Sequence, residues 1–183
     1  MLLQKLPPEP HHPSPPSGRS RIPAALACAL AVWLAAPGVV QADWKVGDLL
    51  PSLAAAGLVG ALPTLEGHVV LIDFWASWCG PCKKSFPVLD ALYATYRARG
   101  LVVLAVSVDE DDAAMQAFLK KQAITFPVVR DAAQRLVAVA GVNAMPSSFL
   151  VDRSGVIRFV HQGFHGDKTE KAYAEEVEAL LKK

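Results

Sequence analysis

The chain has 183 residues, which is enough for one domain with a substantial core and too short for two. Its composition is that of an ordinary globular protein, with an excess of Ala and Pro that lies mostly in the first forty residues. The formal net charge of +1 excludes the strongly basic surface that is typical of nucleic-acid binding, so we expect no nucleic acid among the partners.

Residues 1–42 carry the features of a secretory signal peptide. Residues 6–20 are rich in Pro, Ser and His, a composition that predicts disorder. Arg19 and Arg21 then precede an uncharged run, and its most apolar part, Ala24–Ala36, has the length of a signal-peptide core.

The end of this leader favours cleavage. Val40-Gln41-Ala42 supplies small residues at the positions that a signal peptidase needs, so we expect Asp43 to begin the mature protein. The uncharged run over residues 22–40 is nearly long enough to span a bilayer, which leaves an uncleaved membrane anchor as the alternative. Either outcome places residues 43–183 outside the cytoplasm, and we expect a periplasmic protein.

Loss of residues 1–42 would also remove Cys28 and leave Cys79 and Cys82 as the cysteines of the mature chain. One closely spaced pair cannot build the disulfide framework of a small secreted protein. We therefore expect this pair to be a working redox centre, with no other cofactor.

The first predicted elements of the mature chain surround these cysteines. Leu50–Leu53 is predicted to be an extended strand, and the β-branched and aromatic run over residues 69–75 a buried one. A helix is predicted over residues 81–99, with a kink at Pro87. A Cys-x-x-Cys at such a strand-to-helix junction is typical of a thioredoxin-like redox motif.

The rest of the chain alternates strands and helices and then closes with a hairpin and a helix. The predicted elements are a strand over 101–108, a helix capped by the acidic residues 109–112, a strand over 126–129, a helix over 134–140, strands over 147–151 and 156–162, and a helix over 168–181. This order predicts an α/β fold, a mixed sheet with helices on both faces.

Residues 45–183 resemble the thioredoxin superfamily and, within it, the extracytoplasmic TlpA/ResA-like thiol-disulfide oxidoreductases. The resemblance is strongest over residues 70–84, which include Trp78-Cys79-Gly80-Pro81-Cys82. Residues 142–152 resemble the cis-proline loop of the family, and the segment between Val108 and Ala138 its strand-helix insertion. The resemblance implies a thioredoxin fold with a central mixed sheet and this insertion, and activity by dithiol-disulfide exchange.

Cys79 is predicted to be the attacking sulfur. It precedes the helix, where unpaired N–H groups and the helix dipole favour a thiolate, whereas Cys82 lies one turn inside and can resolve the mixed disulfide. Pro81 donates no N–H and pre-sets the helical backbone. Gly80-Pro81 is also the dipeptide of thioredoxin, whose potential of about −270 mV favours a reductant.

Asp73 is the third predicted catalytic residue, because it occupies the position of the buried acid of thioredoxin. Its apolar neighbours should raise its pKa, so that it can take the proton of Cys82. The chain departs here from its relatives in two ways: Ser85 stands where TlpA/ResA-like proteins use a Glu, and Ala105 where thioredoxins keep a Lys.

Substrate contacts are expected around the cysteines. The resemblance implies a cis bond at Met145-Pro146 and a Met145 backbone that pairs with an extended client segment. Trp78 should shield Cys79 and add apolar contact beside Gly80 and Pro81.

Three alternative functions each fit a part of the sequence. A zinc site would join the two cysteines to His161 and His165, whose spacing from them is far wider than in a zinc finger. A peroxiredoxin-like peroxidase would share the insertion but not the Trp-Cys-Gly-Pro-Cys loop. A non-catalytic client-binding module would not need the dithiol.

The prediction is therefore a monomeric enzyme that reduces disulfides of client proteins and takes electrons from a membrane thiol-disulfide donor. By resemblance, clients would include proteins of cytochrome c maturation or of copper-site assembly.

Overall fold

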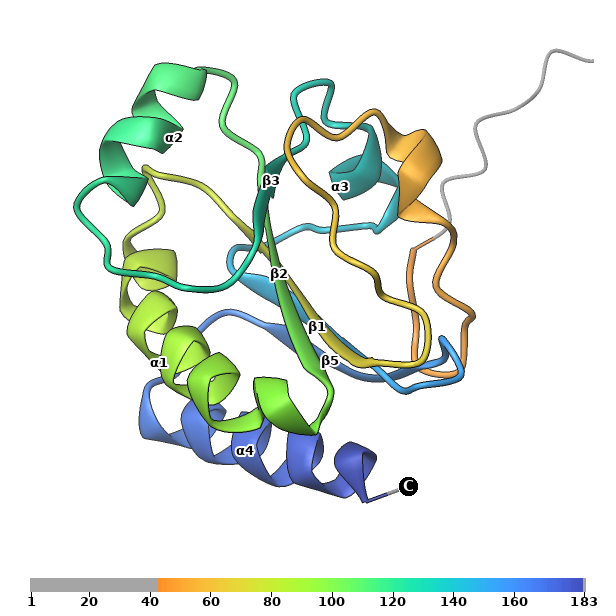
Figure 1. Cartoon of the computed structure of the whole chain (residues 1–183). Helices are drawn as coiled ribbons and strands as arrows, with labels where there is room; N and C mark the ends of the chain where they lie inside the picture. The colour runs from red at the N-terminus through yellow and green to blue at the C-terminus, as the bar shows by residue number, and fades with distance from the viewer. Residues whose placement is uncertain (1–42, 183) are drawn as a thin grey trace, which may run out of the picture. The chain divides into compact units, whose positions relative to one another are not determined.

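The computed structural model describes residues 43–182 (Figure 1). The predicted signal peptide or anchor, residues 1–42, lies outside the described residues. Between residues 43 and 182, none of the helices combines the length and the apolar character that crossing a bilayer requires.

A mixed five-stranded sheet forms the centre of the described part, as the sequence predicted. Across the sheet the strands follow the order β3 (Val128–Arg130), β2 (Leu101–Ser107), β1 (Val69–Trp75), β4 (Ser147–Val151) and β5 (Ile157–Gln162). The β3–β2 and β2–β1 pairs are parallel, whereas β1–β4 and β4–β5 are antiparallel. This is the sheet of a thioredoxin fold. The cysteine pair follows the end of β1, and the Met145-Pro146 loop directly precedes β4.

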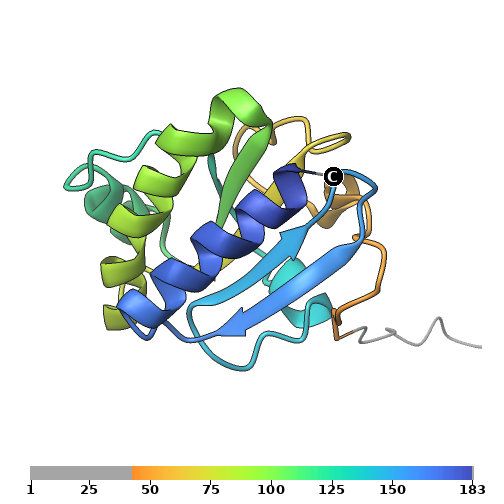
Figure 2. The same cartoon turned by 90° about the horizontal axis from the view of Figure 1, so that it is seen from below.

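Helices cover both faces of this sheet. They are η1 (Leu53–Ala56), α1 (Gly80–Tyr96) with η2 (Arg97–Arg99), α2 (Asp112–Leu119), α3 (Arg135–Val139) and α4 (Asp167–Leu181). Figure 2 shows α1 and α4 side by side on one face, and the Tyr96 hydroxyl of α1 donates to Glu178 of α4 at 2.8 Å. Figure 1 shows α3 on the opposite face.

The side chains of β1 alternate between these two faces, and all seven are buried. Phe74 points to the α3 face, where its ring meets Trp44 and Phe149 at 6.0 and 5.9 Å. Trp75 points to the other face and packs 4.6 Å from Phe86 of α1. Asp73 is two residues before Trp75 and shares its face, so its carboxyl lies beneath α1 and α4.

The predicted strand at Leu50–Leu53 is wrong. The chain there makes only an isolated bridge, between Leu49 and Val156, and then turns into the 3₁₀ helix η1. Pro51 has no N–H to give to a ladder, and the three alanines that follow favour a helical turn. Gly57 ends that turn in the left-handed region, at φ 72°.

Candidate redox site

Cys79 and Cys82 form a disulfide at the start of α1. Cys79 is the N-cap of that helix, and its Sγ accepts the backbone N–H of Cys82 at 3.2 Å. Cys79 is 5% exposed, whereas Cys82 is fully buried. Cys79 therefore lies before the helix and Cys82 one turn inside it, as predicted, and their roles as attacking and resolving sulfurs stay predictions.

The loop that carries Cys79 is held by Asp109, which follows β2. Both carboxylate oxygens of Asp109 accept the backbone N–H of Ser77, at 2.9 and 3.1 Å, and Oδ1 also accepts the Ser77 hydroxyl at 2.7 Å. Ser107 donates its hydroxyl to Oδ2 at 2.8 Å. Asp109 is buried and its carboxylate binds Ser77 and Ser107, so the prediction that it helps to cap the next helix is wrong. It fixes the backbone two residues before Cys79.

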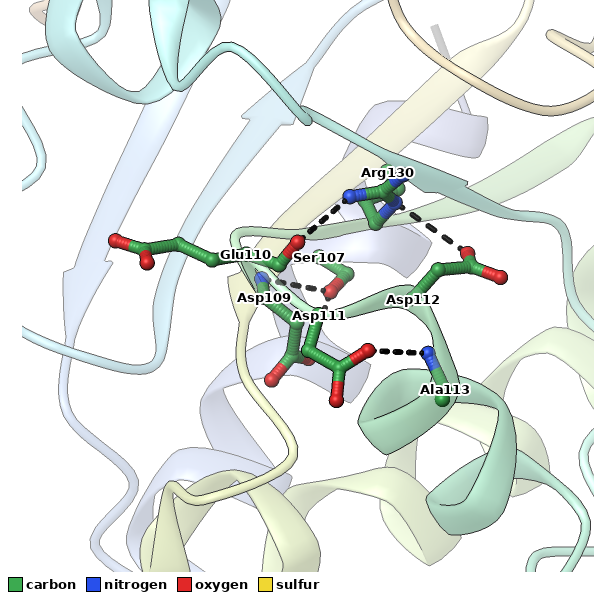
Figure 3. A network of polar contacts seen from close by, with 7 residues as sticks. All are labelled: Ser107, Asp109, Glu110, Asp111, Asp112, Ala113 and Arg130. Atoms are coloured by element: carbon green, nitrogen blue, oxygen red, sulfur yellow. Dashed lines mark hydrogen bonds and ion pairs between the residues drawn. The ribbon is translucent and has the colours of Figure 1, made fainter.

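The other acidic residues of this segment do serve the start of α2 (Figure 3). Asp111 is the N-cap and accepts the N–H of Ala113 at 2.8 Å. Arg130 of β3 binds the Glu110 carbonyl at 3.1 Å and the Asp112 carboxylate at 3.4 Å. These contacts tie the segment to the edge strand, beside the redox loop.

Asp73 is fully buried, as predicted. Burial raises the pKa of its carboxyl from 3.8 to about 7, and a hydrogen bond from Ser148 offsets part of that rise. In the parallel register the neighbour of Asp73 on β2 is Ala105, so the position that holds a lysine in thioredoxins supplies only a methyl group. The predicted upward shift is confirmed.

Sequence reasoning missed the partners of Asp73. Ser148 is its register neighbour on β4 and donates to Oδ1 at 2.5 Å, and the Tyr173 hydroxyl of α4 lies 2.6 Å from the Ser148 oxygen. The Oδ2 atom of Asp73 is buried without a hydrogen-bond partner. The available signal was a serine pair, Ser147-Ser148, in an otherwise apolar strand.

Ser85 stands where the resemblance to TlpA/ResA-like proteins would place a Glu. It is buried, and its hydroxyl donates to the Cys82 carbonyl at 2.9 Å, one turn back along α1. This position therefore supplies no ionisable side chain beside Cys82.

The Met145-Pro146 peptide bond is cis, as predicted. Two adjoining pockets, of about 430 and 590 Å³, share Trp78, Val142 and Met145 in their walls. The smaller one also includes Cys79, Gly80 and Pro81, so four of the five predicted substrate-contact residues, Trp78, Gly80, Pro81 and Met145, come together beside Cys79. Pro146, the fifth of these residues, is buried and lines neither pocket, and Trp78 is 70% exposed.

The histidines of the zinc alternative lie elsewhere. His161 Nε2 pairs with Glu176 Oε2 at 2.7 Å, on β5 and α4. Among residues 43–182 no three His, Cys, Asp or Glu side chains are grouped so that they could hold a metal ion.

A family model described as Redoxin matches residues 45–177, which is most of the chain and includes every residue of the site above. The chain belongs to the Redoxin family. Within this Redoxin protein the match takes in both the cysteine motif and the cis-proline loop.

Relatives of this Redoxin protein carry names from thiol-disulfide chemistry. The "Thiol-disulfide oxidoreductase ResA" of Bacillus thuringiensis (strain Al Hakam) is 34% identical over 142 residues, which cover 76% of this chain and 78% of that protein. The crystal structure of a protein described as a thiol:disulfide interchange protein, DsbE, from Chlorobium tepidum is 35% identical, with a TM-score of 0.70 over 76% of this chain and 99% of that chain. StoA from Bacillus subtilis is 26% identical, with a TM-score of 0.53 over 60% of this chain and 84% of that chain.

The family, the relatives and the fold agree. This Redoxin protein is a thiol-disulfide oxidoreductase with a thioredoxin fold, which confirms the predicted fold class and enzyme class.

Proposed function

We propose that the protein reduces disulfide bonds of client proteins in the periplasm, with Cys79 and Cys82 as its dithiol and Asp73 as its proton acceptor. The observation that carries this proposal is the position of a buried carboxyl beneath the helix that begins at the cysteine pair. Its raised pKa keeps a proton acceptor available near neutral pH.

The reaction starts from the reduced pair. The Cys79 thiolate attacks one sulfur of the client disulfide, so that a Cys79–client disulfide forms and the other client sulfur leaves as a thiolate. The Cys82 thiol gives its proton to Asp73, and its thiolate then attacks Cys79. The Cys79–Cys82 disulfide forms, the second client sulfur leaves, and two electrons have passed to the client, whose thiolates take protons from solvent.

We assign client binding to the groove beside Cys79. Trp78 offers an exposed aromatic face, and Met145 lines the same pocket. We assign Trp78, Gly80, Pro81, Met145 and Pro146 to contact with an extended client segment around its disulfide. No cofactor is needed, because the dithiol itself carries the electrons.

The location and the partners follow from the leader and from the chemistry. Arg19, Arg21 and the apolar run Ala24–Ala36 support export, with either cleavage or anchoring at the membrane. The periplasm has no small-molecule reducing pool, so a membrane thiol-disulfide protein would have to return electrons to the oxidised pair. We propose that the enzyme acts as a monomer on clients of cytochrome c maturation or of metal-site assembly.

Trapping tests this proposal. In Cys82→Ser the mixed disulfide at Cys79 cannot be resolved, so periplasmic extracts should yield client proteins bound to Cys79 and released by a reductant. Cys79→Ser is the control and should trap none. Hydrogen peroxide turnover faster than that of free thiols would instead favour a peroxidase, and client binding that survives in Cys79→Ser/Cys82→Ser would favour a binding module.

A further inference from the structure

A row of side chains crosses the sheet on the face that α1 and α4 cover. The register places Ala105 of β2, Asp73 of β1, Ser148 of β4 and His161 of β5 next to one another in that order. Tyr173 of α4 lies over this row: its hydroxyl is 2.6 Å from the Ser148 oxygen, and its ring packs edge-on at 5.0 Å from that of His161. Asp73, Ser148 and Tyr173 are all buried.

The direction of the hydrogen bonds in this row is fixed by counting hydrogens. Ser148 has one hydroxyl hydrogen, and it goes to Asp73 Oδ1 at 2.5 Å. The Ser148 oxygen must then accept, so the Tyr173 hydroxyl is the donor in their contact. The two hydroxyls form a single chain of donors that ends on one oxygen of the carboxyl.

We propose that Ser148 and Tyr173 are positioning residues for thiol-disulfide exchange: their donor chain holds Asp73 Oδ1 and leaves Oδ2 as the atom that takes the proton of Cys82. This inference rests on the proposed role of Asp73 and deepens it. Oδ2 is the oxygen without a hydrogen-bond partner, and Cys82 is fully buried at the start of α1, the helix that packs on this face through Phe86 and Trp75.

The arrangement lets the carboxyl gain and lose a proton without reorganisation. Oδ1 accepts from Ser148 whether or not Oδ2 is protonated, so neither hydroxyl has to turn when the proton moves. A donor held at Oδ1 also stabilises the ionised carboxyl, which opposes the effect of burial. The chain of hydroxyls therefore sets how strongly Asp73 holds its proton.

Other ionisable groups near this row lie on the two helices that cover it and on β5. On α1 the group is Cys82 once it is reduced, and on α4 it is Tyr173 itself, whose pKa is raised by burial and by the nearby Asp73. Behind Tyr173 the His161–Glu176 pair joins β5 to α4 at 2.7 Å. This pair is unchanged in every variant below, so its charge cancels from the comparison.

The experiment is a titration of the Asp73 carboxyl in the oxidised protein, where Cys79 and Cys82 are joined in a disulfide and neither titrates. The ¹³C signal of the carboxyl, assigned by its loss in Asp73→Asn, is followed against pH. In Ser148→Ala we expect the inflection to move up by about one pH unit, because a donor to a charged group is lost. In Tyr173→Phe it should move in the same direction by less, and in Ser148→Thr, which keeps a hydroxyl, it should stay near its original value.

Two controls remove hydroxyls outside the row, one on β4 beside Ser148 and one on α1 where it contacts α4. Ser147→Ala loses a donor to the Ala144 carbonyl, and Tyr96→Phe loses the donor to Glu178. Neither should move the inflection. An inflection that stays in place in both Ser148→Ala and Tyr173→Phe, or that moves down, overturns the proposal.

A kinetic reading separates this inference from the proposed function. The pH profile of disulfide reduction should shift upward in Ser148→Ala in step with the carboxyl inflection. A carboxyl inflection that moves while the kinetic profile does not would overturn the positioning role. The effect of Cys79→Ser tests the proposed function separately. If this variant still reduced disulfides, the reductase proposal would be wrong whatever the result for Ser148.

Discussion

Ala105 of β2 is the direct register neighbour of Asp73 on β1, so a methyl group stands where a cation would stabilise the carboxylate. Asp73 therefore carries the full effect of burial apart from one hydrogen bond, and its pKa rises to about 7. This raised pKa underlies both the expected loss of folding stability at neutral pH and the proposed role of Asp73 as proton acceptor.

The stability of the oxidised protein should fall as pH rises from about 4 to about 7. In this window the folded protein holds a proton on Asp73 that the unfolded chain has already lost, since the unfolded pKa is near 3.8. The penalty is complete above pH 7 and amounts to about 4 kcal/mol. Denaturant unfolding at pH 4, 6 and 8 measures it.

Asp73→Asn is the control for this pH dependence, because its amide does not titrate. We expect the slope between pH 4 and 7 to be reduced by that amount, although the amide N–H groups without acceptors cost about 1–3 kcal/mol at every pH. The same variant should slow disulfide reduction near neutral pH by about a hundredfold or more. Parallel stability curves for the wild type and the variant would contradict the assigned burial effect.

Asp109→Ala should damage both stability and exchange. It leaves the backbone N–H and hydroxyl of Ser77 and the hydroxyl of Ser107 without their acceptor, which should lower the free energy of unfolding by about 3 kcal/mol. The loop before Cys79 loses its anchor, so the rate of reduction should fall in the protein that remains folded.

Asp131→Ala is the matched control for Asp109→Ala. Asp131 is also buried, and its carboxylate accepts the N–H groups of Arg135 and Val137 at 3.0 and 2.8 Å, at the start of α3. Its loss should lower stability by a similar amount and leave the rate of the folded protein unchanged. Equal rates in the two variants would show that Asp109 has no special hold on the redox loop.

The sequence predicted most of the fold because its strongest patterns are local. The limits of β1 and β4 were predicted correctly, since β1 is apolar apart from Asp73 and β4 runs from the residue after Pro146 to the turn residues 152–155. The segment at Leu50–Leu53 was not, because a proline followed by alanines supports an extended and a helical conformation almost equally. Its conformation depends on packing that no short window contains.

The residues of the site also differ in whether the sequence alone could predict them. Cys79 and Cys82 could be found from their spacing, and Asp73 from the resemblance of its position to that of the buried acid of thioredoxin. Ser148 and Asp109 could not, because each acts on a residue 75 or 32 positions away, and the contact depends on strand register and on the loop after β2. A polar residue in an apolar strand predicts that a partner exists without saying which one.

Trp78→Ala should weaken client binding without unfolding the protein. The side chain is 70% exposed, so the free energy of unfolding should change by no more than about 0.5 kcal/mol. The KM for an unfolded protein substrate should rise several-fold, with a smaller effect on a small-molecule disulfide. Leu49→Ala removes an equally exposed apolar side chain remote from the groove and should alter neither; a rise in KM there would mean that general surface apolarity drives binding.

The position of the acid can be tested by moving it. Ser85 is buried one turn after Cys82 on the same face of α1, where TlpA/ResA-like proteins are expected to carry a Glu. Ser85→Ala should cost no more than about 1 kcal/mol and keep the pH profile of reduction, because the proton acceptor is Asp73. In Asp73→Asn/Ser85→Glu, a carboxyl again lies beside the resolving cysteine, and we expect a large part of the lost rate to return with a new inflection. A double variant that folds but is as slow as Asp73→Asn would contradict a proton acceptor as the reason for the loss.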